Sequence, residues 1–479
     1  MDLRGSQESG VRFARYVAAL ASVIGHKDRV VPLRDYCAGL MLPCERKSVE
    51  PMAQATAPHR TCAQHQSLLH FIGEAGWSDE GVLTKVRELT LPAIERAGPI
   101  EAWIIDDTGF PKQGRHSVGV ARQYCGQLGK QDNCQVAVSL SIANHHASLP
   151  VGYRLYLPQE WVDDAARRCK THVPADITFQ TKPEIALSQL RAACAENLLR
   201  GVGLFDASYG NNCAFRSEVT ALGLTYVAGI LPTTTVWAQG CAPLPAKPWS
   251  GRGRKPKRLR RDDAHQPIAV KELAFSLSKR TWHTIEWREG TAAPLVSRFA
   301  RVRVRAAHGD QALTQARAEE WLLIEWPKGE AAPTKYWLST LAPDISFAEM
   351  VDLAKLRWRI ERDYHDLKQE VGLGDFEGRG WRGFHHHATL CIAAYGFLIS
   401  ERETIPPSGA RCPGHVAPAA LSERDRRRAA AVAQPASHPK LNRHHALPPN
   451  HRARRDATAL PLLPSADRQT REPKELMMQ

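Results

Sequence analysis

Residues 357–368 read Arg-Trp-Arg-Ile-Glu-Arg-Asp-Tyr-His-Asp-Leu-Lys, with Glu361 placed between Arg357 and Lys368. At about 100° per residue, Arg357, Glu361 and Lys368 fall along one edge of a helical face. A carboxylate flanked by cations can stay ionised beside a polyanion, so the segment favours phosphodiester chemistry. Apolar residues recur here at helical spacing and predict an amphipathic helix; they are Leu353, Leu356, Ile360, Tyr364, Leu367 and Val371.

Further carboxylates follow two short apolar segments. Residues 102–105 lead into Asp106 and Asp107, and residues 201–205 lead into Asp206. Each aspartate alone also suits a helix cap or a turn. Strand alternation favours Asp106 over Asp107 as the functional acid, because Asp107 would face the other way. Both remain candidates for the first catalytic position.

Together the acids predict a site for phosphoryl transfer. Asp106, Asp206 and Glu361 are the expected ligands of two Mg²⁺ ions, because a few hard carboxylate oxygens bind Mg²⁺ and leave positions open for water and phosphate. Mn²⁺ is expected to be able to take the place of Mg²⁺. Arg357 is expected to bind phosphate by a bidentate fork and Lys368 as a point charge. The spacing of Arg357 and Glu361 also suits a purely structural ion pair within one helix.

The elements around these acids predict the fold. Three strands, a helix and a fourth strand, with acids after the first and the fourth, is the order of an RNase H-like core. The strands are expected at residues 102–105, 117–124, 135–143 (extended by 152–156) and 201–205, with the helix at 183–198. The fold class is therefore α/β, with a mixed-sheet catalytic core.

The rest of the chain divides into regions by composition and periodicity. Residues 1–96 predict a helical N-terminal domain, which either binds DNA ends or is a plain helical bundle; its helices are expected at 13–24, 31–40, 60–76 and 79–97. Residues 97–224 and 346–404 form the two parts of the core. Residues 225–345 predict a β-rich insertion, with strands at 270–277, 282–289, 296–305, 320–326 and 336–341. Residues 405–479 are rich in Pro, Arg and His, which predicts a disordered tail or a frameshifted end.

The net charge of +14 implies a polyanionic partner. Residues 252–261 hold seven cations and no acid. Such a loop can follow the phosphate backbone of double-stranded DNA without reading its sequence, although a solvated loop has the same composition. The cations expected to bind DNA are Arg252, Arg254, Lys255, Lys257 and Arg258.

The eleven cysteines are scattered and include no Cys-x-x-Cys pair, which argues against a zinc ribbon and indicates reduced thiols. No run approaches the roughly 18 apolar residues that span a bilayer, so we expect a cytoplasmic protein without a membrane partner. Residues 385–387 are three consecutive histidines, which point about 100° apart on a helix and cannot converge on one ion. Trp381 and Phe384 are expected in the core.

The segment Arg357-x3-Glu361-x6-Lys368 resembles the signature around the catalytic glutamate of DDE transposases of the insertion-sequence-four superfamily. Residues 106–112, 119–125, 205–210 and 377–387 resemble its seven-hundred-and-one group, and the likeness runs from about residue 15 to 405. The resemblance implies an RNase H-like core, Mg²⁺ dependence, cutting at terminal inverted repeats and joining to target DNA. It also implies a homodimer in the synaptic complex, at the bacterial nucleoid.

One position departs from that signature. The superfamily usually has a tyrosine three residues before the arginine, and here Ala354 stands in its place. Tyr364 is the candidate to supply the missing phosphate contact. Two other functions fit the same residues: an RNase H-fold nuclease or resolvase without strand transfer, and a non-catalytic DNA-binding protein whose carboxylates are structural.

Overall fold

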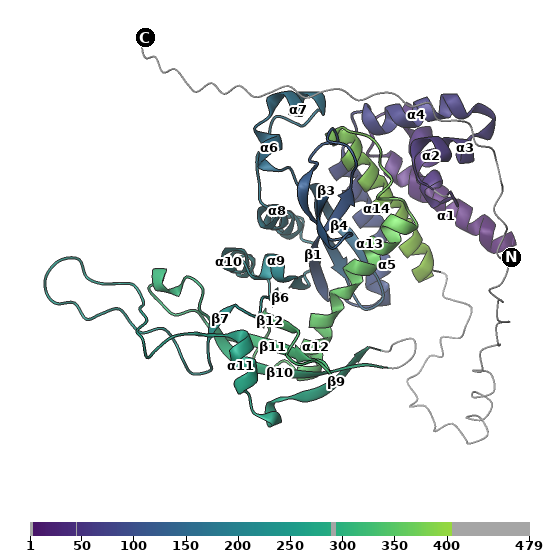
Figure 1. The fold of residues 1–479 in the computed structure, drawn as a ribbon. Coiled ribbons are helices and arrows are strands. Elements are labelled where there is room, and N and C mark those ends of the chain that lie inside the picture. Colours follow the sequence, from purple (N-terminus) through teal and green to yellow (C-terminus); the bar gives the residue numbers. More distant parts are fainter. Residues whose placement is uncertain (1–2, 45, 289–293, 405–479) are drawn as a thin grey trace, which may run out of the picture. The chain divides into compact units, whose positions relative to one another are not determined.

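The computed structural model describes residues 3–44, 46–288 and 294–404 (Figure 1). The predicted tail, residues 405–479, lies outside them. Within the described residues a twelve-stranded mixed sheet has the order β2-β3-β1-β5-β6-β12-β11-β10-β7-β8, with β4 against β3 and β9 against β10. The strands are β1 Ala102–Pro111, β2 Ala121–Cys125, β3 Lys130–Ala143, β4 Ser148–Leu155, β5 Val202–Phe205, β6 Tyr226–Ile230, β7 Thr235–Trp237, β8 Ile268–Ala269, β9 His283–Arg288, β10 Leu295–Ala306, β11 Glu320–Trp326 and β12 Lys335–Ser339.

Five strands make an RNase H-like core in the spatial order β4-β3-β1-β5-β6. The first three are antiparallel to one another, whereas β5 is parallel to β1 and β6 is parallel to β5. The predicted fold class is therefore confirmed. Two details differ: β4 is a separate strand rather than an extension of β3, and β6 belongs to the core although it lies in the region predicted as the insertion.

The insertion is joined to the core by main-chain hydrogen bonds. Strand β12 pairs antiparallel with β6, from Tyr336↔Ile230 to Ser339↔Val227. Four of its predicted strands are confirmed, with residue 289 of one outside the described part. The predicted strand at 270–277 is wrong, because this segment is helix α11 Val270–Ser276. Its buried residues Val270, Leu273 and Ala274 have helical rather than alternating spacing.

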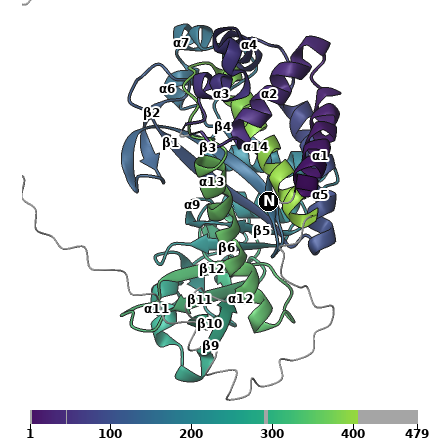
Figure 2. The same cartoon turned by 90° about the vertical axis from the view of Figure 1, so that its right-hand side faces the viewer.

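Helices cover both faces of the core sheet (Figures 1 and 2). On one face, α8 packs on β3 and β4; on the other, α13 lies over β1 and β4, and α14 packs on β4. The helices are α1 Leu3–Ala21, α2 Val30–Met41, α3 Val49–Thr56, α4 Thr61–Gly73, α5 Asp79–Ala97, α6 Gln159–Val162, α7 Ala165–Lys170, α8 Lys182–Ala195, α9 Ala207–Gly210, α10 Cys213–Ala221, α11, α12 Phe347–Leu356, α13 Trp358–Gln369 and α14 Trp381–Thr404. In the described part of the chain, none is long and apolar enough to cross a membrane.

Two of the three consecutive histidines attach α14 to the N-terminal region, whereas the Nε2 atom of His385 accepts a hydrogen bond from the Leu155 backbone N–H of β4 at 3.2 Å. His386 contacts the backbone oxygens of Ile72 and Trp77 at 3.0 Å, and the Nδ1 atom of His387 lies 2.8 Å from the Tyr36 hydroxyl. Burial lowers the pKa of His386 and of His387 to about 4, so both rings are neutral. The predicted divergence of the three rings is confirmed, and these histidines are structural.

Candidate active site

The register of two parallel strands places Asp106 beside Asp206. Strands β1 and β5 pair as far as Ile105↔Phe205, and the next residue on each strand is an aspartate. Neighbouring strands lie about 4.8 Å apart, so the two acids lie side by side at the carboxyl end of β5. Such edges of parallel strands are where open α/β sheets bind ligands. Strand β1 continues to Pro111, so Asp106 lies within the strand. The sequence predicts instead that the strand ends at residue 105 and that Asp106 follows it.

A short turn positions Asp206. As the N-cap of α9, its Oδ1 atom accepts a hydrogen bond from the Ser208 backbone N–H at 3.0 Å and one from the Ser208 hydroxyl at 2.6 Å. The capping role weighed from sequence is therefore present. These bonds orient the carboxylate at the end of β5 without preventing its use as a ligand, because a carboxylate has two oxygens.

The two adjacent aspartates point to opposite faces of the sheet, as strand alternation predicts. Asp106 faces α13, where its Oδ2 atom lies 2.8 Å from Nη1 of Arg357. Asp107 pairs with Lys182 at the start of α8, on the other face. Only Asp106 therefore shares a face with the segment that carries Glu361.

Arg357 lies between Asp106 and Glu361. It stands at a break between α12 and α13, where the sequence predicts one continuous helix, and its Nη2 atom is 3.4 Å from Oε1 of Glu361. The Asp106 side chain is 15% exposed and that of Glu361 is 67% exposed. One half-buried guanidinium thus bridges a shielded carboxylate and an accessible one.

Burial sets the charge state of the inner acid. It raises the pKa of Asp106 to about 6; Arg357 opposes this rise, and the nearby carboxylates Asp206 and Asp107 add to it. The site therefore concentrates negative charge that a single arginine balances only in part. A further cation close to Asp106 would stabilise its ionised form.

Comparison with known proteins gives the family. The sequence model of the family described as DDE superfamily endonuclease matches residues 19–294, which is more than half of the chain. This chain belongs to the DDE superfamily endonucleases. The match includes Asp106 and Asp206 and ends before Glu361. Membership of the family implies the use of a divalent metal ion.

A curated relative of this DDE endonuclease is the probable transposase for insertion sequence element IS701 from Microchaete diplosiphon. It is 32% identical over 166 residues, which are 34% of this chain and 40% of the relative. The chain therefore matches less than half of that relative's length.

The remaining predicted residues of this region lie on α12 and α13. Lys368 donates to the Gly109 backbone oxygen at 2.8 Å, and burial lowers its pKa to about 8. The buried Tyr364 hydroxyl lies 2.5 Å from the Ser139 hydroxyl, so this contact anchors α13 to β3. Ala354 lies on the buried face of α12 and packs in the core.

The basic loop is separate from the carboxylates. It lies between β7 and β8 of the insertion, and all five cations predicted to bind DNA are exposed. Its last arginine, Arg261, is instead held by Asp310 at 2.6 Å. Cations on β10 are likewise engaged locally: Arg301 and Arg303 lie over the ring of Trp321.

Lys182 is a part of the site region that the sequence did not indicate. Its contact with Asp107 joins residues 75 positions apart. The local sequence shows only a helix start, with Thr181 and Glu184 forming a capping box. Nothing in that pattern identifies the acid that the lysine would meet.

Proposed function

We propose that this chain is the transposase of a bacterial insertion sequence, which cuts the transposon ends and joins them to target DNA. The observation that carries the proposal is the convergence of Asp106, Asp206, Arg357 and Glu361 at the carboxyl end of β5. Family membership and the similarity to a probable transposase support the same chemistry.

The donor set fits divalent cations. Asp106, Asp206 and Glu361 offer only carboxylate oxygens, which Mg²⁺ and Mn²⁺ prefer. Among the described residues, these three do not form a group whose ligand atoms all lie within 4.8 Å of one another, and Arg357 lies between two of them. In our proposal Glu361, the exposed member, is the residue that adjusts when the site is loaded.

Two bound Mg²⁺ ions would activate the attacking hydroxyl and stabilise charge on the leaving oxygen. The chain's own groups do the rest. Asp106 and Asp206 are held by the sheet and by the α9 turn, so they define the fixed side of the site. Asp106 must be ionised to serve as a ligand, so a metal ion there competes with the proton that burial favours in the metal-free protein.

Arg357 and Lys368 are proposed to hold phosphates. Arg357 would exchange Asp106 for the scissile or a neighbouring phosphate, because a guanidinium fork binds either anion. Lys368 lies beside Gly109, three residues beyond Asp106 on β1, and would meet the next phosphate of the strand as a point charge.

DNA binding away from the chemistry is assigned to the exposed basic loop. Arg252, Arg254, Lys255, Lys257 and Arg258 can neutralise backbone phosphates of double-stranded DNA without sequence readout. We propose that the terminal inverted repeats and the target are both duplex DNA, that a homodimer forms the synaptic complex, and that the protein acts in the bacterial cytoplasm at the nucleoid.

The test is Mg²⁺-dependent cleavage of DNA that carries the ends flanking the coding region. Glu361→Ala is expected to abolish cleavage while the protein still binds that DNA. Surviving cleavage would refute the three-carboxylate site. Precut ends with a free 3′-hydroxyl then separate the remaining functions: joining to target DNA supports a transposase, whereas hydrolysis without joining indicates a nuclease or resolvase.

A further inference from the structure

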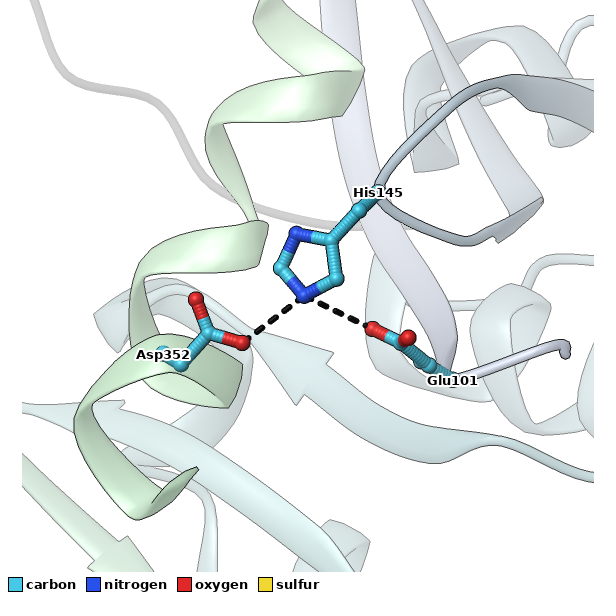
Figure 3. A group of neighbouring side chains, drawn as sticks. All are labelled: Glu101, His145 and Asp352. Atoms are coloured by element: carbon cyan, nitrogen blue, oxygen red, sulfur yellow. Dashed lines mark ion pairs between the residues drawn. The ribbon is translucent and has the colours of Figure 1, made fainter. Parts of the chain in front are cut away.

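A second cluster of potential metal ligands lies at the amino-terminal end of β1. Among the described residues, Glu101, His145 and Asp352 form the one group of three whose ligand atoms all lie within 4.8 Å of one another. Figure 3 shows the three side chains pointing toward a common centre. The His145 Nε2 atom is 2.9 Å from Oε2 of Glu101 and 2.7 Å from Oδ2 of Asp352.

Rigid backbone holds each of these residues. Glu101 precedes β1, and its N–H and C=O bond to Ala143 and Val202 at 3.0 and 2.8 Å. Asp352 lies within α12. His145 lies in the turn between β3 and β4, whose shape is set by the buried Asn144. Ligands placed on a preorganised frame lose little entropy on binding.

The turn that carries His145 is tied down by one side chain. The Oδ1 atom of Asn144 accepts from the backbone N–H groups of His146 and Ala147, both at 2.9 Å. Its Nδ2 atom donates to the backbone oxygens of Ile94 and Gly98, at 2.9 and 2.8 Å. The His145 ring is therefore presented from a fixed loop and not from a mobile one.

The polar groups of the cluster do not satisfy one another by hydrogen bonding. The Nε2 atom of an imidazole carries at most one hydrogen, so it cannot give full hydrogen bonds to both carboxylates. The pKa of Glu101 is raised mainly by burial; His145 opposes this rise, Asp352 adds to it, and His146 and Arg359 lower it. A cation at the centre would bind all three groups at once.

The spacing and surroundings suit a six-coordinate ion. With metal–ligand bonds of about 2.1 Å, adjacent ligands of an octahedral ion lie about 3.0 Å apart, close to both observed separations. A cavity of about 150 Å³ adjoins His145 and Asp352 and can hold water to complete the coordination. Lys355 also lines this cavity, but both oxygens of Glu325 bind its ammonium at 2.6 Å.

We propose that Glu101, His145 and Asp352 bind a divalent transition-metal ion that fastens α12 to the core sheet. An imidazole with two carboxylates favours Zn²⁺, Mn²⁺ or Co²⁺ over Mg²⁺. The side chains are 27%, 43% and 42% exposed, so an ion can enter from solvent. The proposed role is structural. Four residues of β1 separate Glu101 from Asp106, and the ion would hold α12, the helix that leads into Arg357.

Co²⁺ is the probe that tests this site. The full-length chain carries Asp106→Asn and Glu361→Gln, which leave Asp206 as the one proposed catalytic ligand and so weaken binding at that site. Addition of Co²⁺ or Zn²⁺ is expected to raise Tm, and Co²⁺ to give visible absorption without a thiolate charge-transfer band, which would report binding by cysteine. A further substitution in this protein, either His145→Ala or the isosteric Asp352→Asn, should weaken its affinity for Co²⁺ and Zn²⁺ tenfold or more.

His146→Ala is the matched control, because it alters the neighbouring residue of the same turn and should retain full binding. Equal affinity in the His145→Ala and parent proteins would overturn the site, as would the absence of any rise in Tm. An equal rise in Tm with Mg²⁺ would overturn the choice of a transition metal. None of these readouts depends on DNA cleavage, so the result stands apart from the proposed transposase activity.

Discussion

Two adjacent aspartates should respond in opposite ways to the same substitution. Asp106→Asn removes a shielded carboxylate on the face that α13 covers, and Asp107→Asn removes one that pairs with Lys182 on the other face. The first change should lower the rate of Mg²⁺-dependent cleavage by a factor of about a thousand or more, which corresponds to about 4 kcal/mol in activation free energy. The second should leave the cleavage rate within about threefold, because no proposed ligand is lost.

The same Asp106→Asn substitution that abolishes cleavage should increase the stability of the folded protein. Burial raises the pKa of Asp106 from 3.8 to about 6, which corresponds to about 3 kcal/mol. The folded protein then binds a proton more tightly than the unfolded chain, so this contribution to stability is present below about pH 4 and is lost as the pH rises through about 6. Without metal at neutral pH, Asp106→Asn should therefore stabilise the fold by up to about 3 kcal/mol, because this shift already includes the attraction to Arg357.

Asp107→Asn should instead lower stability by about 1 kcal/mol, because it breaks a partly buried ion pair. Urea unfolding with a chelator, from about pH 4 to about pH 7, measures both variants against the parent. The gap between Asp106→Asn and the parent should open with rising pH. A cleaving Asp106→Asn protein, or an inactive but folded Asp107→Asn protein, would refute the assignment of faces.

Three further expectations concern charge. The contribution of His386 and His387 to stability should be lost as the pH drops from about 6.5 to about 4, opposite to that of Asp106, because both rings are buried neutral and the unfolded chain binds their protons more tightly; a pH profile of urea unfolding that is unchanged by His386→Gln and His387→Gln together would contradict this. Replacing the five loop cations at 252–258 by glutamine should lower the slope of log affinity against log salt by up to about 4.5 in DNA-binding titrations. If Lys368 holds phosphate, cleavage should decline above about pH 8 as its ammonium deprotonates, and Lys368→Arg should remove that decline.

The RNase H-like core could be predicted from the sequence because the patterns that indicate it are local. The acids after two apolar strands and the apolar stripe from Leu353 to Val371 each depend on residues close in the chain, and the structure buries that stripe as predicted. The choice between Asp106 and Asp107 followed from strand alternation alone. Helix α11 was missed because a seven-residue segment is short enough to suit either period.

The sequence could not show which groups meet across long separations. Arg357 bonds Asp106 from 251 residues away, and this contact places a cation among the expected ligands. His145 meets Glu101 and Asp352 for the same kind of reason, with no motif joining them. Such contacts arise from sheet order and helix packing, which periodicity does not encode.

The pairing of β12 with β6 has a consequence for synthesis of the chain. Strand β6, whose five residues are all buried, emerges from the ribosome about a hundred residues before its partner. Until β12 arrives, one side of β6 presents unpaired backbone groups, which is the usual template for aggregation. Nascent or truncated products that end before residue 335 should therefore need chaperones, whereas chains that extend past Ser339 can close this edge themselves.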